Sequence, residues 1–398
     1  MGAGQRSSPE QRGRGMTPKA PRFNSCLIMS PAQLDQLLQV LIKRDYEVLG
    51  PTVHEGAVVY DHVSSTKDLP VGWTDEQSGG KYRLKRREDG ALFGFVVGPQ
   101  SWKKFLFPPV ARLWQAHRSD GLFEIVPEVR KPTKFAFIGM RACELHALGV
   151  QDKVFLQGPF VDPVYKLHRE NIFIVAVDCI QAGGTCFCSS MKTGPKAGAG
   201  FDLALTEVIQ EGRHQFVVRV GTKAGADLLS QVPHEEATPA DVDCAENLVA
   251  EAAKHMGRTL DVNGIKEMLY RNTEHARWDQ VADRCLSCSN CTMVCPTCFC
   301  SNVEDLTDLS GQQAERWRKW DSCFTTDFSY IHGSSVRSTP RSKYRQWMMH
   351  KLAYWFDQFG TSGCVGCGRC ITWCPVGIDI TEEARVIRES ETFASAAG

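Results

Sequence analysis

One cysteine pattern occurs twice in the last third of this sequence, and it constrains the fold more than any other feature. Each copy reads C-x2-C-x2-C-x3-C-P. The cysteines of the first copy are Cys285, Cys288, Cys291 and Cys295, and those of the second copy are Cys364, Cys367, Cys370 and Cys374. This spacing is typical of bacterial-type ferredoxins, whose thiolates hold cubane [4Fe–4S] clusters. The repeated pattern therefore predicts two such clusters.

The fourth cysteine of each copy is expected to bind the cluster of the other copy, as in two-cluster ferredoxins. The predicted ligands of one cluster are Cys285, Cys288, Cys291 and Cys374, and those of the other are Cys364, Cys367, Cys370 and Cys295. Zinc explains the pattern less well, because structural zinc usually pairs two C-x2-C hooks and would leave a cysteine of each copy over. Disulfide bonds would be strained in such short loops.

Charge and hydropathy argue against several classes of partner. The 398 residues include 46 basic and 46 acidic side chains, so no net charge draws the chain to nucleic acid or to an anionic membrane. No apolar run approaches the ~20 residues of a membrane span, and the N-terminus lacks the apolar segment of a secretory signal. Because cluster assembly needs reduced thiols, we expect a cytoplasmic protein.

The order of apolar and polar segments predicts an α+β fold. Residues 1–28 are rich in Gly, Arg, Ser and Pro and are predicted to be a disordered extension. Residues 29–250 are predicted to form an α/β domain with a partly parallel sheet. Residues 251–398 are predicted to form a mainly helical domain with a ferredoxin-like dicluster core. Its two cysteine motifs are separated by an insert at residues 296–363.

Local signals place several elements of the α/β domain. Ser30, followed by proline and then Gln33, marks the start of a helix with apolar residues at helical spacing. Two continuous apolar runs, residues 134–140 and 171–177, predict buried parallel strands. Further strands are expected at residues 57–60, 91–97, 201–209 and 215–220. Residues 234–284 are expected to be mostly helical.

Four more cysteines come after the two buried strands. Cys143 follows the first of these strands, Cys179 follows the second, and Cys186 and Cys188 come shortly afterwards. Since parallel strands end at the same edge of a sheet, we expect the four thiols to meet in one crevice. They predict a third [4Fe–4S] site. A zinc site, or buried thiols without metal, are the alternatives.

The insert contains many basic residues and three further cysteines. The basic residues are Arg316, Arg318, Lys319, Arg337, Arg341, Lys343, Arg345 and Lys351. A basic surface can dock a partner or offset the negative charge of reduced clusters, and it can equally be a solvated face. Cys298, Cys300 and Cys323 are either spare cluster ligands or thiols without a ligand role.

Longer landmarks extend the comparison beyond the cysteines. They are IGMRAC at 138–143, TCFCS at 185–189, KLAYWFDQFG at 351–360 and GCVGCGRCITWCP at 363–375. With these landmarks, residues 31–393 resemble the iron–sulfur beta subunit of cytoplasmic sulfhydrogenases, which are NAD(P)-linked [NiFe] hydrogenases. They are similar also to the corresponding iron–sulfur component of anaerobic sulfite reductase. The resemblance implies an electron conduit between a flavin subunit that handles NAD(P)H and a terminal catalytic module. That module is the small and large subunits of a [NiFe] hydrogenase or, alternatively, a sirohaem sulfite reductase subunit.

We therefore expect a non-catalytic electron-transfer subunit of an oxidoreductase complex. Residues 221–225 follow an expected strand but lack the G-x-G-x-x-G pattern, so we expect no flavin or nicotinamide site in this chain. An autonomous reductase with one cluster as its active site is an alternative of another class, and an open iron position would mark it. An interaction module with redox-silent clusters is a third possibility.

Overall fold

The structure, a computed structural model, describes residues 21–119, 121–128, 131–210 and 212–396, with side chains to residue 391. Most of the predicted N-terminal extension lies outside these residues. Its end differs from the prediction, because Cys26–Met29 form strand β1, which pairs with β11 (Arg213–Val220) of the main sheet. In the described part of the chain, no helix is long and apolar enough to cross a membrane.

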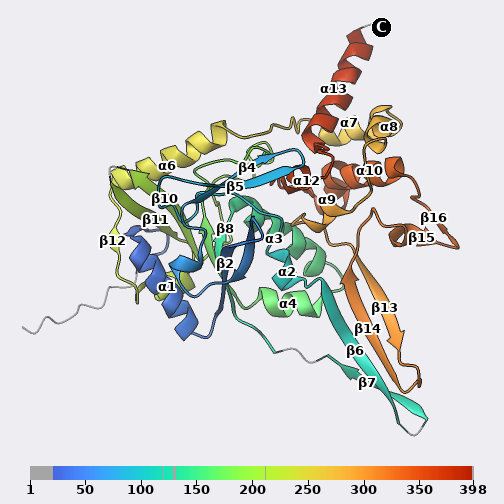
Figure 1. The fold of residues 1–398 in the computed structure, drawn as a ribbon, viewed down its shortest axis with the longest axis horizontal. Helices are drawn as coiled ribbons and strands as arrows, with labels where there is room; N and C mark the ends of the chain where they lie inside the picture. The colour runs from blue at the N-terminus through green and yellow to red at the C-terminus, as the bar shows by residue number, and fades with distance from the viewer. Residues whose placement is uncertain (1–20, 120, 129–130, 211, 397–398) are drawn as a thin grey trace, which may run out of the picture.

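A mixed eight-stranded sheet forms the centre of the N-terminal half (Figure 1), in the order β12-β1-β11-β10-β9-β8-β2-β3. Its other strands are β2 (Glu47–His54), β3 (Ala57–His62), β8 (Phe135–Met140), β9 (Ile172–Val177), β10 (Leu203–Gln210) and β12 (Glu235–Glu236). The β2–β8, β8–β9 and β9–β10 pairs are parallel, and the remaining pairs are antiparallel. The predicted partly parallel sheet and the antiparallel β10–β11 pair are confirmed.

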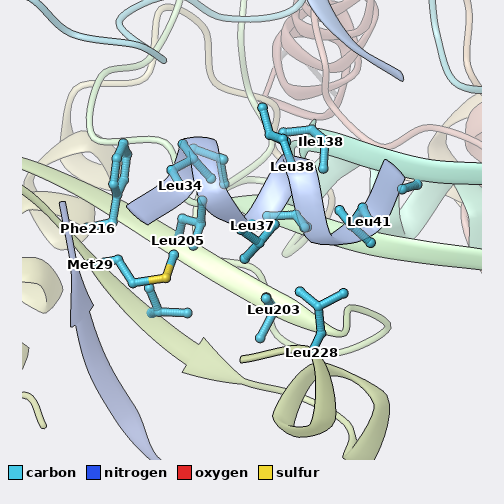
Figure 2. Packing of buried hydrophobic residues seen from close by; sticks show 14 of the residues in the cluster. Met29, Leu34, Leu37, Leu38, Leu41, Ile138, Leu203, Leu205, Phe216 and Leu228 are labelled. Atoms are coloured by element: carbon cyan, nitrogen blue, oxygen red, sulfur yellow. The ribbon is translucent and has the colours of Figure 1, made fainter. Parts of the chain in front are cut away.

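Helix α1 (Pro31–Lys43) covers one face of this sheet. It begins at the predicted capping box, where the Ser30 N–H donates to the Gln33 side chain at 2.6 Å. Its buried stripe consists of Leu34, Leu37, Leu38 and Leu41. Figure 2 shows this stripe packed over the strands, near Leu205 and Phe216. Burial of this stripe is the main force that holds α1 on the sheet.

The opposite face of the sheet is covered by α3 (Ala142–Phe155) and α4 (Pro163–Arg169). Side chains of β8 alternate between the two layers: Ile138 packs with α1, whereas Phe137 packs in the cluster that contains residues of α3 and α4. Strands buried on both faces have the continuous apolar sequences from which they were predicted. Helix α3 therefore starts at the carboxyl end of β8, directly after Arg141.

Residues 91–97 are buried, but they form no strand, so this prediction is wrong. The Glu207 carboxylate accepts the backbone N–H groups of Leu92 and Phe93 at 2.7 and 2.9 Å. The Arg141 guanidinium donates to the Phe93 carbonyl oxygen at 3.0 Å. Because charged side chains satisfy these backbone groups, the segment needs no neighbouring strand.

The insert contributes to a second sheet, in the order β13-β14-β6-β7. Its strands are β6 (Val110–Ser119), β7 (Leu122–Pro127), β13 (Ser301–Thr307) and β14 (Gln313–Trp320). The antiparallel β14–β6 pair joins the insert to the N-terminal half, and the sheet projects as an arm at the lower right of Figure 1. The C-terminal region is therefore less helical than predicted, because its longest strands pair with a distant part of the sequence.

The remaining elements surround the two cysteine motifs or connect the sheets. The helices are α2 (Lys103–Leu106), α5 (Lys223–Leu229), α6 (Pro239–Lys254), α7 (Ile265–Arg271), α8 (Arg277–Ala282), α9 (Asn290–Met293), α10 (Pro340–Met349), a π-helical turn (His350–Tyr354), α11 (Trp355–Phe359), α12 (Arg369–Thr372) and α13 (Ile380–Ala396). The small strands are β4 (Trp73–Ser78), β5 (Lys81–Arg86), β15 (Tyr330–Ile331) and β16 (Ser334–Ser335), with single 3-10 turns at Thr66–Asp68 and Asp327–Ser329.

Candidate metal centres

The two cysteine motifs adopt the same local backbone. Helices α9 and α12 start after Ser289 and Gly368, which hold equivalent places in the two copies and have left-handed φ values of 68° and 75°. The second copy has glycine there for a reason of space. A Cβ on Gly368 would lie 2.4 Å from the carbonyl oxygen of Thr185. The second motif is thus in close contact with the loop that carries Cys186.

The first group of cysteines lies near the molecular surface. Its members, Cys285, Cys288, Cys291 and Cys374, line one cavity of about 410 Å³. The structure therefore brings the fourth cysteine of the second copy to the first three of the first copy. Cys288 is exposed, and the neighbouring Leu286 side chain is 64 % exposed. The N–H of Ile378 donates to the Cys374 sulfur at 3.3 Å.

The second group is more deeply buried. Its members are Cys364, Cys367, Cys370 and Cys295. Burial raises the pKa of Cys370 well above its ordinary value, and the charges of the other three members act in the same direction. The N–H of Gly366 donates to the Cys364 sulfur at 3.5 Å. Four thiolates this close together repel one another, so a bound cation would stabilise them.

A buried lysine contacts the second group. The Lys351 ammonium lies 3.0 Å from the Cys295 sulfur and 3.2 Å from the Thr297 hydroxyl oxygen, and the residue is 5 % exposed. Although burial acts to lower the pKa of Lys351, the thiolates of Cys295 and Cys298 raise it well above its ordinary value. The sequence pattern placed Lys351 on a basic surface, whereas in the structure it lies in the interior.

The four N-terminal cysteines also come together, as the third group. Cys143 lies in the first turn of α3 and Cys179 follows β9, and with Cys186 and Cys188 they line a cavity of about 330 Å³. Cys367 of the second group lines the same cavity. Burial raises the pKa of Cys143 and of Cys186 well above the ordinary value. The four thiols therefore share one crevice, as expected from the strands that precede them.

A buried ion pair connects the second and third groups. Arg369, next to Cys370, pairs with Glu144, next to Cys143, and their side chains are 0 % and 1 % exposed. The hydroxyl of Tyr60 donates to the Glu144 carboxylate at 2.9 Å. The pair fixes α12, which carries the second motif, against α3.

The three remaining cysteines near the motifs lie beside the groups. A hydrogen bond from Cys298 lowers the pKa of Cys295 well below its ordinary value. A hydrogen bond from Cys323 likewise lowers the pKa of Cys300. The ammonium of Lys103 donates to the backbone carbonyl oxygen of Cys298 at 3.0 Å. These thiols therefore contact a member of the second group or each other.

Most basic residues of the insert are engaged in ion pairs. The pairs are Arg316–Asp305, Arg318–Asp162, Lys319–Glu304, Arg341–Glu274 and Arg345–Glu274. Two of them join the strands of the β13–β14 hairpin, and Arg318 connects the hairpin to the start of α4. For these residues the predicted basic surface is replaced by local charge pairing.

Three sets of four cysteines suit [4Fe–4S] clusters, because such clusters are held by cysteine thiolates. Hydrogen bonds to ligand sulfurs tune these clusters, and the Cys295, Cys364 and Cys374 sulfurs each accept one. Among the residues that the structure describes, no group of three or more His, Cys, Asp and Glu side chains is arranged to hold a single metal ion. The donor set therefore fits the clusters.

The charged residues between the groups were not predicted from the sequence. Lys351 had a usable signal, because it lies within an apolar run, between Met349 and Leu352. A lysine is rarely buried unless it is paired, so its position already suggested an internal anionic partner. Glu144 and Arg369 carry no comparable local signal, since their pairing depends on the packing of α3 against α12.

Comparison with known proteins gives two matches. A family model described as a 4Fe-4S dicluster domain matches residues 284–378, which include both cysteine motifs. Sulfhydrogenase 2 subunit beta of Pyrococcus furiosus (strain ATCC 43587 / DSM 3638 / JCM 8422 / Vc1) is 30 % identical over 351 residues, which are 87 % of this chain and 94 % of that protein. The second match includes the N-terminal half as well as the motifs.

Proposed function

Since the chain belongs to the family of iron–sulfur beta subunits of sulfhydrogenases, we propose that it relays electrons between a flavin subunit that handles NAD(P)H and the small and large subunits of a [NiFe] hydrogenase. A bound [4Fe–4S] cluster supplies a one-electron redox couple. The observation that carries the proposal is that the three groups of cysteines form one continuous series.

Shared cavity walls connect the members of this series. Cys367 belongs to the second group and also lines the cavity of the third group. Cys370 belongs to the second group and also lines the cavity of the first group. The second group is therefore the middle of the series, and the chain brings it into contact with both neighbours.

We propose three [4Fe–4S] clusters, one on each group. The ligands are Cys285, Cys288, Cys291 and Cys374 in the first group, Cys364, Cys367, Cys370 and Cys295 in the second, and Cys143, Cys179, Cys186 and Cys188 in the third. Crossed placement of Cys295 and Cys374 supports the first two sets. The common cavity supports the third set.

The first group provides a point of contact for a partner. Cys288 is exposed, and Leu286 and Val376 present apolar surface beside it. Exposed apolar side chains around a buried functional group are typical of protein interaction sites. A redox partner bound there would reach the first group without opening the fold.

A relay is favoured over catalysis at a cluster. Each group supplies four thiolates, so each iron has a cysteine ligand and no position is left open, as an autonomous reductase would require. The name of the Pyrococcus relative favours hydrogenase partners over the sirohaem subunit of a sulfite reductase. Because the many free thiols need a reducing compartment, we also propose a cytoplasmic location.

Anaerobic reduction by NAD(P)H tests this function. The reconstituted chain alone should show no change in cluster absorbance with NAD(P)H, since no dinucleotide fingerprint occurs in its sequence. Addition of a sulfhydrogenase flavin subunit should bleach the clusters, and the hydrogenase subunits should then produce H2. Stoichiometric flavin in the purified chain, with NAD(P)H oxidation, would contradict the proposal. Co-purification with a sirohaem protein would reassign the partners.

A further inference from the structure

We propose that Lys351 sets the reduction potential of the second group by holding a positive charge against the Cys295 sulfur. This inference rests on the proposed function, because it requires a [4Fe–4S] cluster on the second group. The positive charge stabilises the more negative, reduced form of the cluster, so it raises the potential. Lys351 would thereby make the middle of the series the preferred resting place of an electron.

The geometry directs the ammonium at one ligand sulfur. Lys351 Nζ lies 3.0 Å from the Cys295 sulfur, which is a normal distance for a charge-assisted hydrogen bond to sulfur. The Thr297 hydroxyl, at 3.2 Å, holds the same ammonium on its other side. That hydroxyl in turn donates to the Gly363 carbonyl oxygen at 2.7 Å, so its orientation is defined.

The local fold positions Lys351 between the two motifs. It lies in the π-helical turn His350–Tyr354 that joins α10 to α11. Such turns are rare and frequently occur at functional sites, because they redirect a side chain. The Lys351 carbonyl oxygen accepts the N–H of Gly363 at 2.8 Å, directly before Cys364. The residue therefore reaches the first motif with its side chain and the second with its backbone.

The charge of Lys351 requires an anion nearby. A buried ammonium is costly unless it is paired, because burial removes its water. In the described part of the chain its hydrogen-bond partners are a thiol sulfur and a hydroxyl oxygen rather than a carboxylate. A cluster with four thiolate ligands carries a net negative charge, and it would provide the missing counter-charge.

The first group has a different environment. Among the described residues, the wall of its cavity carries no charged side chain, and it includes Phe324, Tyr344 and Trp347. The sulfur of Cys374, equivalent to Cys295 in the repeat, accepts a neutral backbone N–H instead of an ammonium. The repeat is therefore symmetric in its ligands but asymmetric in charge, which predicts unequal potentials.

Lys103 provides a matched control. It is also buried, at 4 % exposed, and its Nζ lies 3.8 Å from the Trp320 ring centroid. Its hydrogen bond goes to the Cys298 carbonyl oxygen and not to a sulfur of the second group. Lys103→Met thus removes a buried charge from the same region without breaking a bond to a proposed ligand.

The experiment is a redox titration of the full reconstituted chain, followed by EPR. Lys351→Met should lower the potential of one cubane by at least 59 mV, which is a tenfold change in the ratio of oxidised to reduced cluster. That cubane should be the one whose EPR signal Cys295→Ser alters. Lys351→Arg should keep most of the parent potential, and Lys103→Met should cause less than a tenfold change.

Two results would overturn the inference. One is a Lys351→Met chain with parent iron content in which every cubane shifts less than tenfold. The other is an equal shift in Lys103→Met. If Lys351→Met loses iron, Lys351→Gln, which keeps an N–H donor but no charge, is judged by the same tenfold threshold. A parent chain without reducible cubanes would instead contradict the proposed function, so the two failures are distinguishable.

Discussion

Replacement of Glu144 by glutamine should destabilise the connection between the second and third groups. The carboxylate of Glu144 faces Arg369, and both side chains are buried. It also accepts hydrogen bonds from the Tyr60 hydroxyl at 2.9 Å and from the Trp102 indole N–H at 3.1 Å. Glu144→Gln keeps the shape but leaves the Arg369 charge without a counter-charge. Breaking a buried pair in this way costs about 3–5 kcal/mol.

Thermal unfolding of the anaerobic chain, followed by circular dichroism, measures this cost. At about 2 °C per kcal/mol for a large chain, Glu144→Gln should lower the midpoint by about 6–10 °C. The matched control is Glu389→Gln, the same chemical change in an exposed i,i+4 pair with Arg385. It should leave the midpoint unchanged, because exposed pairs contribute little. Equal midpoints for both variants would refute the argument that the buried pair joins the two groups.

The crossed ligand sets predict that Cys374→Ser damages the cluster on the first group; EPR showing loss of the second group's cluster instead would reject the assignment. Cys186→Ser should remove about four irons per chain in iron analysis, because a cubane contains four, and unchanged iron content would exclude the third site. Gly368→Ala should lower the thermal midpoint more than Gly360→Ala. Both positions have positive φ, but only Gly368 faces a backbone oxygen at 2.4 Å, so equal losses would contradict the close contact with Thr185.

Much of the candidate site could be predicted because its signals are local. The motif spacing is set by how a short loop surrounds one cubane, so it is readable in the sequence alone. The βα units were equally readable, since β8 and β9 have continuous apolar sequences and end next to Cys143 and Cys179. From these endings the common cavity of the third group followed.

The misjudged parts depend on long-range contacts. Residues 91–97 have the apolar character of a strand, but Glu207, from a distant strand, satisfies their backbone instead. The β13–β14 hairpin finds its partner in β6, which no local pattern indicates. Lys351 was grouped with basic neighbours in sequence, yet Arg341 and Arg345 pair with Glu274 while Lys351 turns inward to sulfur.

The most direct test of the relay is to count reducible clusters and their coupling in the full chain. The account predicts about twelve irons per chain after anaerobic reconstitution, which correspond to three cubanes. It also predicts three one-electron steps and an EPR spectrum broadened by spin–spin interaction, because the three groups adjoin one another. About eight irons with two reducible cubanes, or three cubanes whose signals do not interact, would contradict a continuous series.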